Sequence, residues 1–432
     1  MPQRREKEHM PTNYFNIPLY KDTLLDINYL FAKKDQPKLP ILTKTDVKKA
    51  FPQVFMTAAL KDAIAAGKVE FAFTSGTSER LQIVRPKGWW STEFTRAYHS
   101  IPDMSNYEIG AHRKAVLTGA ICSASACWRD KPTLIDRATD GVLSLNFHND
   151  PNQWTRGDIE RIDYELRTFA PQLLEVNPNY LAIFLSKRAL YNLQAPLFRP
   201  RWITASYDLL THRHRNFIES AFNVPVFSMF GSTEIGVIFL QNSRGEFVHN
   251  TAEHFLELRP FLADRGIYEL IITCWKNPFM PLLRYATGDL VQVTEGQKVD
   301  SIFDDTRPLK ISRLHGRAKD AIVLHNEKIL TAAELDDECY KQVPMAFQYQ
   351  YQHSDEQLPT LLWTVDPSEA ESTKRQQSDA AKTITLDKDV KIQLRQVSSL
   401  RTKLSGKFPT VRQSTSPIEC RGKNLWNLNF LK

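Results

Sequence analysis

The sequence is poor in cysteine, and its cysteines do not form a metal-binding pattern. Their number is odd, and no pair with metal-ligand spacing is matched by a second pair. They are Cys122, Cys127, Cys274, Cys339 and Cys420. This pattern predicts reduced thiols in a cytoplasmic protein and argues against a disulfide framework. The chain also lacks an internal repeat, which argues against a solenoid or a propeller.

Long hydrophobic runs are missing as well. The most apolar long stretch, 222–240, is interrupted by Asn223, Pro225 and Ser232-Thr-Glu234, and it is too polar to span a bilayer. The first nine residues are charged and contain no apolar core of a secretory signal. We therefore expect no membrane span, no secretory signal and a cytoplasmic location.

No block of like charge stands out, although the net charge is +7 from 56 basic and 49 acidic residues. A basic excess spread along the chain suits small polyanionic ligands such as nucleotides. No nucleic-acid-binding motif accompanies it, so we expect no nucleic-acid partner. With 432 residues, of which 42% are hydrophobic, the chain can build a sizeable core and more than one domain.

Strands and helices are expected to alternate through the middle of the chain. The pattern predicts a helix at 115–126, a strand at 141–147, a helix at 155–166, a strand near Tyr180 followed by a helix through Leu193, a strand at 202–205, a helix at 210–222 and a strand at 224–229. This alternation argues for a doubly wound α/β core. Closely spaced strands follow from about residue 247 and suggest an antiparallel segment. A small α+β domain is expected to begin near Lys319. It should contain a helix from Thr331 that begins with the capping box Thr331-Ala-Ala-Glu334.

One polar loop follows a predicted strand early in the chain. Val69, Phe71 and Phe73 alternate with period two, as in a strand. The run Thr74-Ser-Gly-Thr-Ser78 comes next and has hydroxyl groups around one glycine. Such a loop can present backbone N–H groups and hydroxyls to a phosphate, but a plain turn is the alternative. The motifs further along the chain favour the phosphate.

Four more short motifs follow this loop. They are Phe230-Gly-Ser-Thr-Glu234, Arg284-Tyr-Ala-Thr-Gly-Asp289, Gly316-Arg-Ala-Lys-Asp-Ala-Ile322 and Arg401-Thr-Lys-Leu-Ser-Gly-Lys407. In this order and spacing, the set resembles the adenylate-forming superfamily of acyl- and aryl-CoA synthetases, peptide-synthetase adenylation domains and luciferases. The segment Leu39-Pro-Ile-Leu-Thr-Lys-Thr-Asp46 and the short chain are similar to the phenylacetate–CoA ligase branch.

The resemblance implies an ATP- and Mg²⁺-dependent carboxylic acid ligase. Such an enzyme forms an acyl- or aryl-adenylate, releases pyrophosphate, and transfers the acyl group to a thiol. CoA is the first expectation for the acceptor, and the phosphopantetheine of an acyl carrier protein or an amine are alternatives. The bulk of Phe147, Tyr207, Met229 and Phe230 favours an aryl or medium-sized acid. A scaffold that binds nucleotide without turnover is the alternative of another class.

The resemblance also assigns roles to individual residues and to two domains. It implies an ATP- and acid-binding domain at 1–318 and a mobile lid at 319–432 with its hinge at Lys319. Thr74, Ser75, Gly76, Thr77 and Ser78 would hold the β- and γ-phosphates; Ala205, Ser206, Tyr207, Phe230, Gly231 and Ser232 would bind the nucleotide; Thr233 would contact the α-phosphate; Glu234 would bind Mg²⁺; Asp289 and Arg317 would bind the ribose; and Lys407 would bridge the carboxylate and the α-phosphate.

The sequence departs from the family pattern at several positions. Glu79-Arg-Leu-Gln82 replaces the usual Gly-x-Pro-Lys after the hydroxyl run, and His325-Asn326 stands where glycines are common in a thiol channel that would extend to Lys328. Lys423 competes with Lys407 for the catalytic role. Local alternatives also remain for the two acidic residues, because Asp289 could be a turn residue and Glu234 could lie at a helix N-terminus.

Overall fold

A computed structural model describes most of the chain: residues 17–20, 40–49, 51–74, 81–119, 133–145, 150–251, 254–274, 276–299, 302–324, 327–354, 357–369, 383–386, 390–403 and 405–413. Several sequence-based predictions lie outside these residues: those for Ser75, Gly76, Thr77, Ser78, Glu79, Phe147, His325, Asn326, Lys423, Cys122, Cys127 and Cys420. Cys274 and Cys339 are buried free thiols. Within the described ranges, no helix is long and apolar enough to cross a membrane.

A twelve-stranded sheet runs through the larger part of the molecule. Its parallel half consists of β3 (Lys114–Leu117), β5 (Val142–Ser144), β6 (Leu173–Val176), β7 (Trp202–Ala205) and β8 (Val226–Ser232). The spatial order is β5-β3-β6-β7-β8, so the direction of strand addition reverses between β3 and β6. In open α/β sheets, ligands bind beyond the carboxyl ends of the strands at such a switch point.

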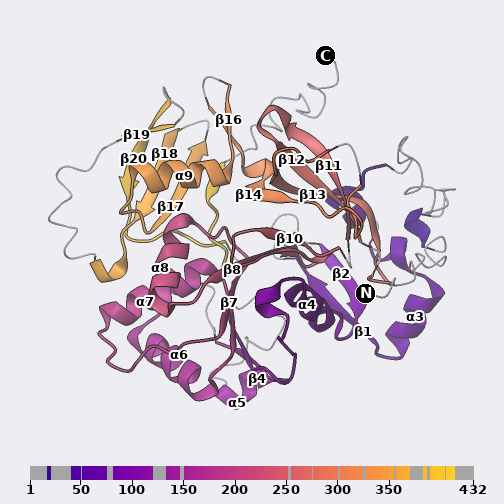
Figure 1. Ribbon diagram of the computed structural model, residues 1–432, viewed down its shortest axis with the longest axis horizontal. Helices are drawn as coiled ribbons and strands as arrows, with labels where there is room; N and C mark the ends of the chain where they lie inside the picture. The colour runs from indigo at the N-terminus through magenta and orange to yellow at the C-terminus, as the bar shows by residue number, and fades with distance from the viewer. Residues whose placement is uncertain are drawn as a thin grey trace.

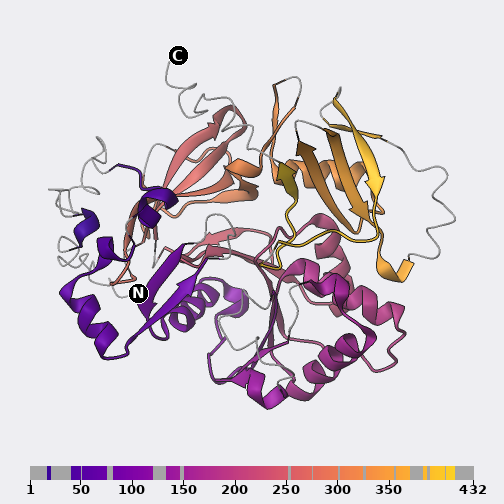
Figure 2. The same cartoon turned by 180° about the vertical axis from the view of Figure 1, so that it is seen from behind.

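Helices cover both faces of this parallel half, which confirms the predicted doubly wound core. On one face lie α6 (Arg156–Phe169), α7 (Pro178–Leu190) and α8 (His212–Phe222); on the other lies α4 (Trp89–His99). Successive strand residues alternate between the two layers, since Leu174 packs with α6–α8 and Leu173 packs with α4. Figures 1 and 2 show the two helix layers at the lower part of the molecule.

The sheet continues as an antiparallel half beyond β8. The added strands are β9 (Gly236–Gln241), β10 (Phe247–His249), β14 (Ile311–Arg317), β13 (Leu282–Val293), β12 (Ile267–Cys274) and β11 (His254–Leu262), in that spatial order. At the opposite edge, β4 (Ala138–Thr139) pairs with β5 and follows the short α5 (Leu134–Arg137). The predicted antiparallel segment is therefore part of the same sheet as the α/β core.

The N-terminal part packs beside this antiparallel half. It contains α2 (Lys44–Lys49), α3 (Ala58–Ala65) and a hairpin of β1 (Val69–Phe73) and β2 (Gln82–Pro86). Leu42 exchanges backbone hydrogen bonds with β13, so the segment that resembles the phenylacetate–CoA ligase branch lies against the strand that carries Asp289. Short 3-10 turns occur at Pro18–Tyr20, Gln53–Phe55, Pro102–Met104, Pro151–Gln153, Ala263–Arg265, Ala318–Asp320 and Pro367–Glu369.

The C-terminal part forms separate sheets. The hairpin of β15 (Ile322–Val323) and β16 (Ile329–Leu330) comes first, then α9 (Ala332–Gln342), and then a sheet in the order β19 (Thr383–Leu386), β20 (Val390–Gln396), β18 (Gln357–Thr364), β17 (Gln348–Ser354) and β21 (Val411–Gln413). Thr331 caps α9 through the predicted capping box with Glu334. In Figure 1 this part lies above α7 and α8.

The structure corrects two of the predicted elements. Tyr180 lies inside α7, and the strand expected near it is β6, which ends at Val176. The helix expected at 115–126 begins instead as strand β3, because Lys114–Leu117 pairs with both β5 and β6. Both errors concern short buried strands, which hydrophobic periodicity alone does not distinguish from buried helices.

Candidate active site

A cavity of about 680 Å³ lies between the carboxyl ends of the parallel strands, strands β13 and β14, and the C-terminal part. Its wall contains most of the described residues to which the sequence assigned a role: Thr74, Ser206, Tyr207, Phe230, Gly231, Ser232, Thr233, Glu234, Asp289, Arg317, Lys319 and Lys407. Ala205 is buried as the last residue of β7, just beneath this wall. The fold thus brings together residues that are far apart in the sequence.

The turn between β8 and β9 carries Thr233 and Glu234. It is tight, since Ser232 pairs with Gly236 across the hairpin. A Cβ atom on Gly231 would collide with the backbone of Gly236, and one on Gly236 would collide with the Glu93 carboxylate. Only glycine fits both positions. The alternative that Glu234 lies at a helix N-terminus is wrong, because a strand follows it.

Asp289 and Arg317 face each other across two antiparallel strands. The register of β13 and β14 pairs them directly, and Arg317 Nε lies 3.4 Å from Asp289 Oδ1. Burial raises the pKa of Asp289, and the positive charge of Arg317 opposes that rise. Asp289 lies within β13, so it is a strand residue and not the turn residue that was the alternative.

Thr287 and Glu269 fix the backbone next to Asp289. Thr287 Oγ1 accepts the N–H of Asp289 at 3.0 Å and donates to Leu270 O at 3.0 Å. Gly288 has φ +74° and donates its N–H to Glu269 Oε1 at 3.1 Å. These hydrogen bonds fix the backbone of β13 at Asp289, and so they fix the position of its carboxylate at the cavity wall.

Glu234 offers a carboxylate of the type that Mg²⁺ prefers. The residue is 8% exposed, and its Oε1 accepts the Tyr285 hydroxyl at 3.1 Å. The described residues contain no cluster of three or more metal-ligating side chains. Mg²⁺ in nucleotide enzymes commonly uses one or two carboxylates together with substrate phosphates and water. The Glu234 carboxylate, on the cavity wall, would therefore suit a magnesium ion bound together with nucleotide phosphates.

Lys407 belongs to a tight loop that is seated on the core. Lys403 N donates to Lys407 O, and Gly406 N donates to Lys403 O, both at 2.8 Å. The Tyr180 hydroxyl donates to Gly406 O at 3.0 Å. A Cβ on Gly119, just beyond β3, would lie 2.6 Å from Ser405 O. The loop thus lies directly over the switch point between β3 and β6.

Asp208 anchors this loop from the core. Its Oδ2 accepts the backbone N–H of Phe408 at 3.0 Å and the amides of Asn177 and Asn179 at 2.8 and 3.3 Å. Burial raises the pKa of Asp208, and the charge of neighbouring Lys407 acts against the rise. One carboxylate therefore connects the carboxyl ends of β6 and β7 to the residue after Lys407.

Four cations lie near one another on a cavity wall that also carries acidic side chains, among them Asp208, Glu234, Asp289 and Asp320. Lys403, Lys407, Arg317 and Lys319 all line it. Burial lowers the pKa of Lys403, and the other three cations lower it further, whereas Asp320 raises it. Cations this close to one another repel unless an anion binds between them. The arrangement is suited to a polyphosphate.

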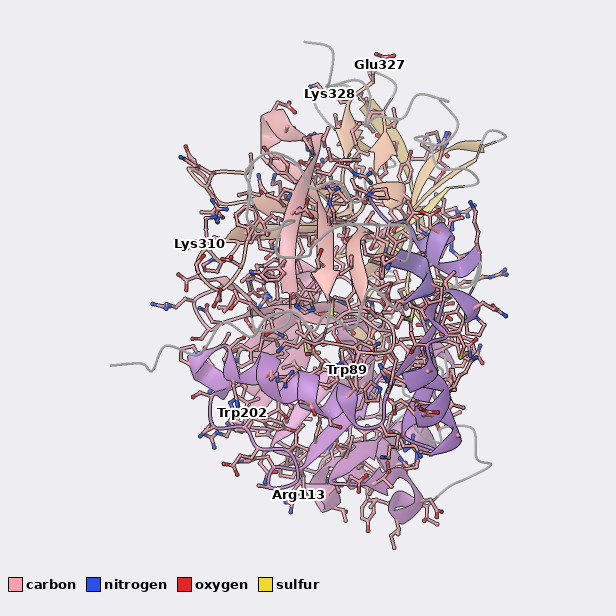
Figure 3. The ribbon with its side chains drawn as sticks, turned by 90° about the vertical axis from the view of Figure 1, so that its right-hand side faces the viewer. Trp89, Arg113, Trp202, Lys310, Glu327 and Lys328 are labelled. Carbon is pink, nitrogen blue, oxygen red and sulfur yellow. The ribbon has the colours of Figure 1, made fainter. Side chains whose placement is uncertain are left out.

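Lys319 and Lys328 lie in different environments. Lys319 lies in the 3-10 turn between β14 and β15, where the chain leaves the large sheet. Lys328 and Glu327 are exposed at the tip of the β15–β16 hairpin. Figure 3 shows Glu327 and Lys328 at the end of the molecule opposite Arg113. Of the segment predicted to line a thiol channel, the described residues Glu327 and Lys328 are not part of the cavity wall.

Sequence reasoning missed many residues of the cavity wall, among them Asp208, Lys403 and Glu175. Asp208 follows a predicted strand, and polar residues at that position are typical of ligand sites in α/β sheets. Lys403 lies within the Arg401–Lys407 motif. Glu175 interrupts the apolar run Leu173-Leu-Glu-Val176, but the strand containing it was placed incorrectly.

The fold is that of adenylate-forming ligases. A crystal structure of 2-hydroxyisobutyryl-CoA ligase in the postadenylation state, in complex with 2-HIB-AMP, matches with a TM-score of 0.63 and 12% identity over 95% of this chain and 88% of that one. The anthranilate CoA ligase AuaEII, in complex with anthranoyl-AMP, matches with a TM-score of 0.50 and 13% identity over 82% of this chain and 65% of that one.

The sequence itself matches more narrowly. It is 31% identical to Protein CapK of Staphylococcus aureus over 183 residues, which are 41% of this chain and 39% of that protein. No protein-family model matches.

Proposed function

We propose that this chain, which has the fold of adenylate-forming ligases, is an ATP-dependent carboxylic acid ligase that forms an acyl-adenylate and passes the acyl group to a thiol. The observation that carries the proposal is the convergence of Lys407, Asp289 and Glu234 on one cavity, where Lys403, Lys319 and Arg317 lie close to Lys407. These residues come from three motifs that are distant in the sequence. A shared fold alone would not require this set of side chains.

The first step joins two anions, so its chief requirement is charge compensation. The carboxylate of the acid attacks the α-phosphorus of ATP, and the bond to pyrophosphate breaks. Lys407 holds the carboxylate and an α-phosphate oxygen together, and Thr233 donates to the same phosphate. Asp289 accepts hydrogen bonds from the ribose hydroxyls, beside Arg317. A magnesium ion held by Glu234 would neutralise phosphate charge when ATP is bound.

The second step requires a different arrangement of the lid. Lys407 lines the cavity, whereas Glu327 and Lys328, at the tip of the β15–β16 hairpin, lie outside its wall. Rotation of residues 319–432 about Lys319 would withdraw Lys407 and bring the hairpin toward the cavity. Such domain closure is a common way to keep water from a reactive intermediate. CoA is the proposed acceptor, and a carrier-protein phosphopantetheine or an amine are the alternatives.

Pyrophosphate release tests the proposal. The protein is incubated with ATP, Mg²⁺ and a panel of aromatic, amino and short aliphatic acids, with and without CoA. At least one acid should stimulate release, and CoA should convert its adenylate to the thioester, detected by mass spectrometry. If the protein binds ATP but no acid stimulates release, the nucleotide-binding scaffold is the better description.

Lys407→Ala identifies the catalytic lysine. The adenylation rate of the variant should fall by about a hundredfold or more, because the positive charge that stabilises the transition state is removed. The variant should retain transfer from a supplied acyl-adenylate. Lys310→Ala, a lysine on the exposed loop before β14, serves as the control (Figure 3). Survival of adenylation in Lys407→Ala would show that another lysine has the role.

A further inference from the structure

One wall of the cavity contains a buried ion pair that the proposed chemistry does not use. Glu175, in the middle of strand β6, is 2% exposed and lines the cavity. Lys114 Nζ, from the neighbouring strand β3, donates to Glu175 Oε2 at 3.0 Å. Because the two charges cancel, the wall presents hydrogen-bonding atoms without a net charge.

Two tyrosines complete this cluster. The Tyr207 hydroxyl donates to Glu175 Oε1 at 2.7 Å, and the Tyr98 hydroxyl lies 3.4 Å from Oε2. Tyr207 has φ +75°, a conformation that costs free energy for any residue other than glycine. That backbone conformation directs the Tyr207 side chain toward Glu175 at the cavity wall.

Aromatic and apolar side chains surround the same part of the cavity. The rings of Trp90 and Phe94, on one face of α4, pack edge to face with centroids 5.1 Å apart. Lys114 Nζ lies 4.5 Å from the centre of the Phe94 ring. Met229, from β8, lies in the same cluster and is 7% exposed. Trp90, Phe94 and Met229 all line the cavity with Glu175.

The cluster is set back from the adenylating groups. Glu175 lies two residues before Asn177, which contacts the Asp208 carboxylate that anchors the Lys407 loop. Two residues of strand correspond to a rise of about 6.6 Å. Glu175 and Lys407 both line the cavity, so a flat ring bound between them would have its carboxylate at Lys407 and its opposite end at the ion pair.

Stability does not explain the ion pair. Replacing a buried ion pair by apolar residues of similar volume is often neutral or stabilising. A carboxylate has acceptor capacity for about four hydrogen bonds, and Lys114, Tyr207 and Tyr98 account for three donors among the described residues. A ligand hydroxyl can supply the fourth. An ammonium group would suffer repulsion from Lys114 nearby.

We propose that Glu175 and Tyr207 select an aromatic acid with a phenolic hydroxyl at the end remote from its carboxylate. The inference rests on the proposed ligase function and names the substrate class of that site. The ring packs against Phe94, Trp90 and Met229, and the hydroxyl donates to Glu175. Sites built around a hydrogen bond discriminate against analogues that lack the partner, because a buried polar group is then left unpaired.

Matched acids test the inference. Pyrophosphate release is measured with 4-hydroxybenzoate and benzoate, with 4-hydroxycinnamate and cinnamate, and with 4-(aminomethyl)benzoate. The hydroxylated acid of at least one pair should have a kcat/KM at least about tenfold above that of its partner, and the aminomethyl acid should be poorest. Equal kcat/KM values within both pairs, or preference for the ammonium, would overturn the inference and leave the ligase function intact. Absence of release with any acid would overturn both.

Variants identify the residues responsible. The double variant Glu175→Leu with Lys114→Met removes both charges at similar volume, and it should reduce the hydroxyl preference to less than threefold. The control is Glu165→Leu with Arg137→Met, a buried pair outside the cavity wall, and it should retain the preference. Tyr207→Phe, a smaller change, should raise KM for the hydroxylated acid more than for its partner. An unchanged preference in both Tyr207→Phe and the folded double variant would refute the assignment.

Discussion

Because Asp208 anchors the Lys407 loop, we expect its removal to impair adenylation and to spare thioester formation. Asp208→Ala removes the carboxylate that accepts the Phe408 N–H between the core and the C-terminal part. A hydrogen bond to a charged group contributes about 1.5–3 kcal/mol. The equilibrium between the seated and the released loop should therefore shift by about tenfold to a hundredfold. The proposed role of Lys407 in adenylation requires the seated loop, so we expect the adenylation rate to fall by a similar factor.

The two half-reactions separate this effect from a general loss of structure. Rapid-quench measurement of pyrophosphate release follows adenylation, and thioester formation from a supplied acyl-adenylate follows transfer. Asp208→Ala should impair the first and spare the second, and Asp208→Asn should be milder. Asp103→Ala is the control, since Asp103 accepts the N–H of Ser243 at 3.3 Å in an exposed position. Equal losses in both half-reactions, or no loss in either, would refute the anchoring role.

Three further predictions concern charge and the hinge. Burial raises the pKa of Asp289, so the folded protein binds a proton there more tightly than the unfolded chain does. The free energy of unfolding should therefore fall as pH rises from the ordinary pKa of the carboxyl group to its raised pKa in the folded protein. Asp289→Asn should raise the urea midpoint at pH 7, and it should weaken ATP binding, measured by calorimetry. Burial lowers the pKa of His214, His254 and His315 to about 4, so the unfolded chain takes up more protons and the free energy of unfolding, from urea titrations, should fall as pH drops from about 6.5 to 4. Lys319→Pro fixes φ at the proposed hinge and should slow transfer alone; equal loss of adenylation would argue against a hinge there.

Local sequence patterns predicted much of the core. The alternation of strands and helices and the capping box at Thr331 depend on neighbouring residues, and the structure has both. Strand β6 was misplaced for a physical reason. Its four residues are all buried and run directly into α7, which is itself buried around most of its circumference. A continuous apolar run carries no periodicity that would separate the strand from the helix.

The candidate site was predictable where a motif marks it and not where only tertiary contacts define it. Gly231 and Glu234 lie within one short run, and the close backbone approach that requires glycine is local. Asp208 meets Phe408 across 200 residues of sequence. Glu175 gains its partners from β3, α4 and the loop after β7. No local sequence pattern predicts these tertiary contacts, because they depend on the order of strands in the sheet.

Trapping the intermediate shows directly whether this chain forms an acyl-adenylate with the help of Lys407. The protein is mixed with ATP, Mg²⁺ and an acid that stimulates pyrophosphate release, with no thiol acceptor, and the quenched mixture is analysed by mass spectrometry. We expect one acyl-adenylate per active site in the unmodified protein and none above background in Lys407→Ala. Conversion of ATP to ADP and phosphate, or an acyl-adenylate formed equally well without Lys407, would contradict it.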